Sequence, residues 1–313
     1  MSRRIVITTD YLEPGDSVDR LLRENGLDPV YSPAAGRRTE DVQRNLLKGA
    51  VGAIVASEPI TRDMLAEAAD LRILARSGVG YDSVDTTAAQ EFGIRVANTP
   101  GVNHHAVAEL TLALMLNCAK HFSDVIAGTN AGQWPRIAGT ELRGKTLGVI
   151  GYGPSGKAIA AIGAALGMKV IVGTSHPDTE AGPSIEFADV DTVVAAADYL
   201  TLHARAAGTP MIDADRLAAM KDTAFLINTA RGSLIDEAAL VDALERGQIA
   251  GAALDVLETE PMSKDNPLRN FDNVWITSHL AGQTVEARER VGIAAARTVI
   301  DVLDGKEPVG LIV

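Results

Sequence analysis

The stretch that decides the fold reads Lys145-Thr146-Leu147-Gly148-Val149-Ile150, followed at once by Gly151-Tyr152-Gly153-Pro154-Ser155-Gly156. The first six residues predict a buried strand, and the chain from Lys157 onward predicts a helix. Between them the glycines have the spacing of a dinucleotide-binding turn. In such a turn Gly151 permits a tight bend, Gly153 lets the backbone approach a pyrophosphate, and Gly156 allows close packing of helix on strand. We therefore expect NAD or NADP to bind here, with Pro154 and Ser155 at the variable positions.

The choice between the two cofactors depends on the end of the next predicted strand. A carboxylate about 20 residues after the glycines would hold the ribose 2′-hydroxyl of NAD, but Thr174 stands there. Without that carboxylate a 2′-phosphate is admissible, and Thr174, Ser175 and His176 could all donate hydrogen bonds to it. We therefore favour NADP over NAD, while a weak hold of the NAD ribose by Thr174 stays open.

Outward from this segment, short apolar runs alternate with helical patterns along the whole chain. This alternation predicts an α/β fold with two doubly wound parallel-sheet domains, a Rossmann cofactor domain being inserted into a flavodoxin-like substrate domain. We expect the substrate domain to contain residues 1–98 and 283–313, and the dinucleotide-binding domain residues 99–282. A single long helix is predicted over residues 105–127. The predicted strands are residues 5–7, 51–56, 73–76, 95–98, 147–150, 169–172, 199–202, 224–228, 251–255 and 274–278.

Composition narrows the classes of function. The chain of 313 residues is 46% hydrophobic and carries a net charge of -12, which argues against nucleic acid or anionic lipid as the main partner. No apolar stretch is long enough to cross a membrane. The one cysteine, Cys118, allows no disulfide within the chain and predicts a reducing, cytoplasmic location. The scattered histidines show no metal-ligand spacing, so we expect no metal.

Three later segments each place polar residues at the end of a predicted strand. They are Asn228-Thr229-Ala230-Arg231-Gly232, Asp255-Val256-Leu257-Glu258-Thr259-Glu260-Pro261 and Thr277-Ser278-His279-Leu280-Ala281-Gly282. Carboxyl ends of parallel strands meet at one edge of a sheet, where such folds bind ligands. Together the segments supply an anion clamp, a carboxylate and a tunable acid or base. Beside a nicotinamide cofactor, this set predicts hydride transfer on a small oxo or hydroxy acid.

These features together resemble the D-isomer-specific 2-hydroxyacid dehydrogenases, the family of D-3-phosphoglycerate dehydrogenase and glyoxylate/hydroxypyruvate reductase. The resemblance covers nearly the whole length. It is carried by the glycine turn, the three segments above, residues 76–85 (RSGVGYDSVD), residues 96–101 (VANTPG), residues 107–109 (VAE) and residues 303–309 (LDGKEPV).

The resemblance implies a role for each matched residue. Arg231 would bind the substrate carboxylate, His279 would donate the proton during reduction, and Glu260 would pair with His279 and favour its charged form. Asp255 and the backbone near Ala230 would hold the nicotinamide carboxamide. The amides of Val79 and Gly80 would complete the carboxylate cradle from the substrate domain. Members of this family commonly form homodimers, so the resemblance also implies a homodimer.

The substrate is less well defined than the reaction. Ala56 and Glu58 stand where phosphoglycerate enzymes carry cations, and Glu58 would repel a phosphate. Arg136, within Gln133-Trp134-Pro135-Arg136, could instead reach an anion, so D-3-phosphoglycerate stays possible. We favour a small 2-oxoacid such as glyoxylate or hydroxypyruvate. A different class also stays open, because some relatives on this fold are nucleotide-sensing, partner-binding proteins.

Overall fold

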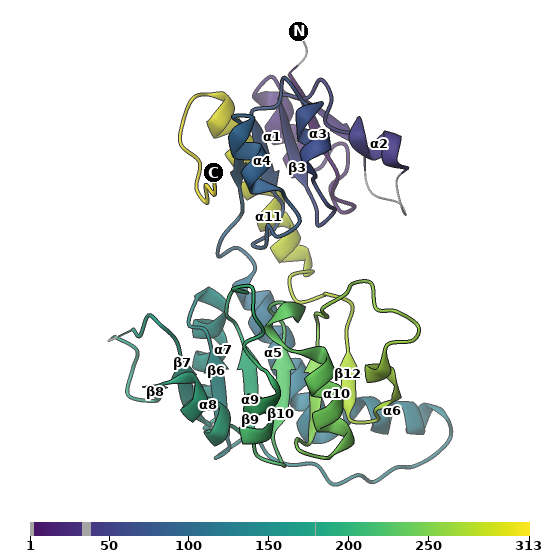
Figure 1. The fold of residues 1–313 in the computed structure, drawn as a ribbon, viewed down its shortest axis with the longest axis vertical. Helices are drawn as coiled ribbons and strands as arrows, with labels where there is room; N and C mark the ends of the chain where they lie inside the picture. Colours follow the sequence, from purple (N-terminus) through teal and green to yellow (C-terminus); the bar gives the residue numbers. More distant parts are fainter. Residues whose placement is uncertain (1–2, 33–38, 179) are drawn as a thin grey trace. The chain divides into compact units, whose positions relative to one another are not determined.

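The computed structural model describes residues 3–32, 39–178 and 180–313 (Figure 1). The chain divides into two compact units. Unit 1 contains Met1–Asn103 and Gln283–Val313, and unit 2 contains His104–Gly282. The predicted boundary lay between residues 98 and 99, whereas the units separate between residues 103 and 104.

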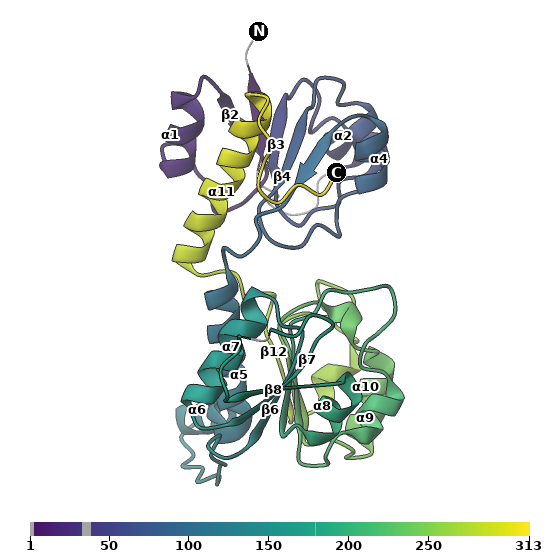
Figure 2. The same ribbon diagram turned by 90° about the vertical axis from the view of Figure 1, so that its left-hand side faces the viewer.

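Unit 1 is built on a parallel sheet whose described strands have the order β2-β1-β3-β4-β5. This is the flavodoxin-like order. Helices α1 and α11 cover one face of the sheet and α2, α3 and α4 the other (Figure 2). The strands are β1 (Arg4–Ile7), β2 (Asp28–Tyr31), β3 (Gly52–Val55), β4 (Ile73–Arg76) and β5 (Arg95–Ala97). The helices are α1 (Ser17–Glu24), α2 (Glu40–Arg44), α3 (Arg62–Ala66), α4 (Thr86–Glu91) and α11 (Val285–Leu303).

Unit 2 is built on a second parallel sheet, whose described strands have the order β12-β11-β10-β9-β6-β7-β8. Because β6 starts the series and the order reverses beside it, this is the Rossmann arrangement. Its strands are β6 (Thr146–Ile150), β7 (Lys169–Gly173), β8 (Ile185–Ala188), β9 (Tyr199–Leu202), β10 (Phe225–Asn228), β11 (Gly251–Leu254) and β12 (Val274–Ile276). The α/β class and the two parallel sheets predicted from the sequence are confirmed.

The helices of unit 2 form a layer on each face of its sheet. Helices α5 (His104–Lys120), α6 (Phe122–Asn130) and α7 (Pro154–Ala165) lie on one side, and α8, α9 and α10 on the other (Figure 2). The second layer comprises α8 (Val190–Ala196), α9 (Ala214–Ala219) and α10 (Glu237–Glu245), and short 3₁₀ turns occupy Gly232–Leu234 and Pro267–Asn270. Both layers bury apolar cores on the central strands β6, β9, β10 and β11, which are almost wholly buried, as expected for parallel sheets.

The single helix predicted over residues 105–127 is wrong. The chain breaks at His121, whose φ of 54° lies in the left-handed region, and α6 begins after it. The side-chain oxygen of Asn117 accepts hydrogen bonds from the backbone N–H and the hydroxyl of Ser123, at 2.9 and 2.7 Å. Side-chain acceptors of this kind compete with the helical backbone and end the helix. The apolar pattern of the sequence continues across this point, so it does not reveal the helix end.

No described helix has the combination of length and apolar character that crossing a bilayer would require.

Candidate active site

The glycine turn between β6 and α7 has the geometry of a dinucleotide cradle. Gly151 has a φ of 95°, and a Cβ there would lie 2.6 Å from the carbonyl oxygen of His203. A Cβ at Gly156 would lie 2.1 Å from the carbonyl oxygen of Gly151, so the helix could not approach the strand with any side chain present. Gly153 has open space around it, where a pyrophosphate can come close. The residues present therefore fit NAD or NADP.

His203, which follows β9, lies beside this turn. Its Nδ1 is 3.2 Å from the Ser155 hydroxyl and its Nε2 is 3.1 Å from the Thr201 hydroxyl. Burial lowers the pKa of His203 to about 4, so the ring is neutral at physiological pH. A neutral imidazole can fix the Ser155 hydroxyl at the helix start, a role that sequence reasoning did not single out.

The loop after β7 contains the three residues predicted to meet the cofactor ribose. The Thr174 hydroxyl accepts a hydrogen bond from the N–H of His176 at 3.2 Å, and the Ser175 hydroxyl lies 2.8 Å from Nδ1 of His176. Ser175 and His176 are exposed and Thr174 is half-buried. The loop thus presents hydroxyl and imidazole groups to solvent at the end of β7.

Arg231 lies just beyond β10 on a turn that the buried Asn228 holds. The Asn228 side chain accepts from the N–H of Ala230 at 3.0 Å and donates to the carbonyl of Arg231 at 2.8 Å. Nη1 of Arg231 donates to the carbonyl of Ala230 at 2.6 Å. Next to it, a Cβ at Gly232 would lie 1.9 Å from the carbonyl carbon of Leu257. Only glycine lets the arginine turn lie directly on the loop after β11.

Asp255 organises the loop that carries His279. Its side chain is wholly inside the unit and accepts from the Thr277 hydroxyl at 2.6 Å, the Leu280 N–H at 2.7 Å and the Ala281 N–H at 2.8 Å. Its carbonyl accepts from the N–H of His279 at 2.9 Å. The resemblance implies a contact of Asp255 with nicotinamide, and the structure shows that Asp255 holds the loop that carries His279. Contact with the cofactor stays a prediction.

His279 and Glu260 form a hydrogen-bonded pair. Nδ1 of His279 lies 2.8 Å from Oε2 of Glu260, while Oε1 of Glu260 accepts from the N–H of Leu257 at 2.9 Å. The backbone of His279 has a φ of 57°, a left-handed conformation that is sparsely populated outside glycine and common at functional sites. Because Nδ1 is engaged by Glu260, Nε2 is the ring nitrogen left to face a substrate.

The Glu260 carboxyl is tuned by its surroundings. Burial alone would raise its pKa, but the hydrogen bonds from His279 and from the Leu257 N–H outweigh burial and hold the pKa below its ordinary 4.5. The positive charge of Arg231 acts in the same direction. Glu260 is therefore an anion at neutral pH, and the structure brings Arg231, Glu260 and His279 together in unit 2.

Val79 and Gly80 lie in unit 1, on the loop that follows β4. Asn98 fixes this loop by donating to the carbonyl of Val79 at 2.6 Å, and the Thr99 hydroxyl accepts from the N–H of Gly78 at 3.0 Å. The structure thus orders the loop within its own unit. Its predicted part in the carboxylate cradle stays a prediction.

Arg136 is exposed and lies on the segment that joins α6 to the amino end of β6. Figure 1 shows this segment passing the end of the unit 2 sheet where β6 begins, opposite the strand ends that carry the predicted catalytic residues. The structure therefore does not bring Arg136 together with Arg231 and His279 within one chain.

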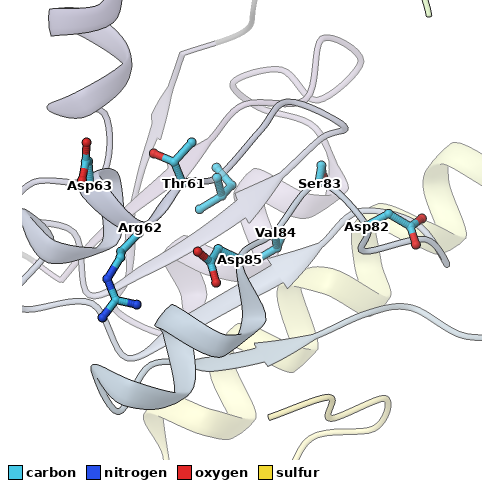
Figure 3. Close-up of a pocket in the computed structure, with 8 residues that line it drawn as sticks. Thr61, Arg62, Asp63, Asp82, Ser83, Val84 and Asp85 are labelled. Atoms are coloured by element: carbon cyan, nitrogen blue, oxygen red, sulfur yellow. The ribbon is translucent and has the colours of Figure 1, made fainter. Parts of the chain in front are cut away.

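A separate hollow of about 500 Å³ lies in unit 1 (Figure 3). Its wall includes Asp63, Asp82 and Asp85, which suggests a cation site, but Asp85 caps α4 by accepting from the N–H of Ala88 at 2.8 Å. Among the described residues no group of three carboxylate, histidine or cysteine side chains is placed to hold a metal ion. The hollow contains none of the predicted site residues.

A Rossmann unit that sets an arginine and a histidine–glutamate pair at its strand ends defines a nicotinamide-dependent dehydrogenase. Comparison with known proteins narrows the class. The family model described as the D-isomer specific 2-hydroxyacid dehydrogenase, NAD binding domain, matches residues 112–281. The chain belongs to the D-isomer specific 2-hydroxyacid dehydrogenase family.

Individual relatives agree on the family and differ in substrate. A glyoxylate reductase of Thermofilum pendens is 37% identical over 284 residues, which cover 87% of this chain and 84% of the relative. A D-3-phosphoglycerate dehydrogenase of Methanocaldococcus jannaschii is 37% identical over 310 residues, covering 96% of this chain and 58% of the relative. The solved structure of an acyclic imino acid reductase in complex with NADPH and D-Arg is 31% identical, with a TM-score of 0.87 and coverage of 99% and 100%. The predicted family and enzyme class are confirmed.

Proposed function

We propose that this dehydrogenase reduces a small 2-oxoacid, of the glyoxylate or hydroxypyruvate type, to its D-2-hydroxyacid with NADPH. The observation that carries the proposal is the 2.8 Å pair between His279 and Glu260, with Arg231 on the neighbouring turn after β10. An acid beside a carboxylate and an anion-binding guanidinium is what reduction of a 2-oxoacid requires.

In the proposed mechanism the bound reduced nicotinamide supplies the hydride. The guanidinium of Arg231 binds the substrate carboxylate, and its positive charge stabilises the negative charge that develops on the reacting carbonyl oxygen. His279 donates the Nε2 proton to that oxygen as the carbonyl carbon gains hydride, and the 2-hydroxyacid leaves a neutral imidazole behind. The Glu260 carboxylate holds Nδ1 throughout, which fixes the ring for the transfer.

The chemistry beside β3 favours an uncharged distal group on the substrate. Both carboxylate oxygens of Glu58 are shielded from solvent, and burying a second anion near a shielded carboxylate is costly. D-3-phosphoglycerate is the competing substrate. We expect glyoxylate and hydroxypyruvate to be reduced with a kcat/KM at least about tenfold above that for 3-phosphohydroxypyruvate, each measured with NADH and NADPH. A higher kcat/KM for the phosphorylated acid would refute the substrate assignment.

We expect Glu260→Gln to lower the kcat for reduction, because the neutral amide cannot hold Nδ1 of His279 as the carboxylate does. In the native enzyme the carboxylate lies 2.8 Å from Nδ1 and fixes the ring for proton transfer. The lowered pKa of Glu260 means that its ionised form stabilises the fold above pH 4.5, an effect lost as the pH falls through that lowered value. With 36% of its side chain exposed, this stabilisation is small, so the variant should fold.

The matched control for this variant is Glu258→Gln, which removes an exposed carboxylate two residues away. Initial rates from pH 5 to 10 should show a native profile for the control. A Glu260→Gln profile that overlays the native one would show that Glu260 has no part in proton transfer.

We further propose that the protein is a homodimer and that α6 with the segment after it forms the contact. None of the described α6 side chains is buried, and four large apolar side chains here are exposed: Phe122 (49%), Ile126 (58%), Trp134 (82%) and Ile137 (45%). A second copy would cover this patch. Arg136 lies on this same segment. In the proposed dimer it would therefore reach a substrate anion in the active site of the second copy. Sedimentation analysis should then give twice the 32.8 kDa chain mass.

A further inference from the structure

A lysine lies beside the loop that should meet the cofactor ribose, although that loop contains no lysine or arginine of its own in residues 174–178. Nζ of Lys157 is 2.6 Å from Oδ2 of Asp178, the last residue of this stretch. Lys157 belongs to the first turns of α7, directly after Gly156. The fold therefore brings a cation from the glycine turn to the predicted ribose loop.

Aromatic packing holds this lysine on that side of the turn. Its Nζ lies 5.4 Å from the centre of the Tyr152 ring, and Tyr152 stands edge-on to Phe187 of β8 at 5.2 Å. Tyr152 is itself part of the glycine turn. Lys157 thus lies between Tyr152 and Asp178, and Asp178 is on the loop after the carboxyl end of β7, where the ribose end of a Rossmann cofactor lies.

We propose that Lys157 is the cation that recognises the 2′-phosphate of NADP and that Asp178 is its counter-ion when the cofactor is absent. On binding, the lysine exchanges the carboxylate for the phosphate, while Thr174 and Ser175 supply neutral donors from the loop. The inference rests on the proposed preference for NADP and names the residue responsible for it.

The pair is suited to such an exchange because it contributes little to stability. The Lys157 and Asp178 side chains are 52% and 32% exposed, and exposed ion pairs are typically weak. The Asp178 hydrogen bond raises the pKa of Lys157, and the reciprocal bond lowers the pKa of Asp178, so both groups are charged at neutral pH. A dianionic phosphate competes well for a lysine whose present partner carries a single charge.

Binding of cofactor fragments tests the proposal without turnover. By calorimetry we expect the native protein to bind 2′,5′-ADP more tightly than 5′-AMP. Lys157→Gln should weaken 2′,5′-ADP at least about tenfold and change 5′-AMP less than about twofold, because it removes one charged phosphate contact. Asp178→Asn should tighten 2′,5′-ADP, since it removes the competing carboxylate. The matched controls are Arg246→Gln and Asp242→Asn, which break an exposed ion pair of α10.

Three results would overturn the inference in different ways. If the native protein prefers 2′,5′-ADP and Lys157→Gln leaves the ratio of the two dissociation constants unchanged, the preference stands and Lys157 is not its source. A native protein that prefers 5′-AMP removes the NADP preference and this role of Lys157 together. Equal weakening of both fragments by Lys157→Gln would indicate a structural role and would also refute the proposal.

Discussion

Replacing His279 with alanine should lower kcat for 2-oxoacid reduction at least about a hundredfold, with the dissociation constant for NADPH little changed. Acid catalysis by a positioned side chain is worth roughly 10²–10⁴-fold, and His279 is the histidine that Glu260 positions. The cofactor cradle is built by the turn at Gly151–Gly156, on different strands, so its affinity should survive. Initial rates and fluorescence titration with NADPH measure the two quantities separately.

The backbone at His279 calls for a second variant, because alanine is disfavoured at its φ of 57°. His279→Asn tolerates that conformation and should show the same loss of kcat with a native melting temperature. His121→Asn is the matched control, since His121 also has a positive φ, of 54°, and pairs with a carboxylate at 3.6 Å. A kcat within about fivefold of native for both His279 variants would refute its role as the acid.

The parts of the fold predicted correctly are those that combine several signals. Strands such as β6 and β10 are largely apolar runs bounded by breaks, and the glycine turn has a fixed spacing. The two strands that were not predicted, β2 and β8, both lie at the edge of a sheet. An edge strand pairs on one side only and buries fewer of its side chains. For this reason β2 tolerates Pro29, and β8 tolerates the exposed Glu186. Neither shows the apolar run by which buried strands are recognised.

The site shows the same division. Strand ends of a parallel sheet converge, so Arg231, Glu260 and His279 could be grouped from the sequence, and the structure brings them together. The supports of these residues could not be predicted, because they depend on contacts between loops. Three such contacts join segments that are between 21 and 26 residues apart and leave no periodic pattern. They are the hydrogen bonds that Asp255 accepts from three donors, the contact of Gly232 with Leu257, and the ion pair of Lys157 with Asp178.

The second large effect concerns Arg231. We expect Arg231→Lys to lower kcat/KM for the 2-oxoacid by roughly 10²–10³-fold, comparable to the loss of one preorganised donor at a reacting oxygen. Nη1 of the guanidinium donates a hydrogen bond to the carbonyl of Ala230 at 2.6 Å, and that bond sets the direction of the remaining donors. A lysine has one ammonium group and cannot hold the turn and grip a planar carboxylate at once. KM for the oxoacid should rise and kcat should fall.

Two measurements separate this role from a structural one. The inhibition constant of oxamate, a carboxylate that cannot be reduced in the same way, should rise in Arg231→Lys, while the dissociation constant for NADPH stays near native. Arg246→Lys, on the exposed end of α10, is the matched control and should behave as native. Because Arg231 also contributes to the lowered pKa of Glu260, the neutral variant Arg231→Gln should additionally shift the pH profile, whereas Arg231→Lys keeps the charge. Native oxamate inhibition in both variants would mean that the substrate carboxylate is bound elsewhere.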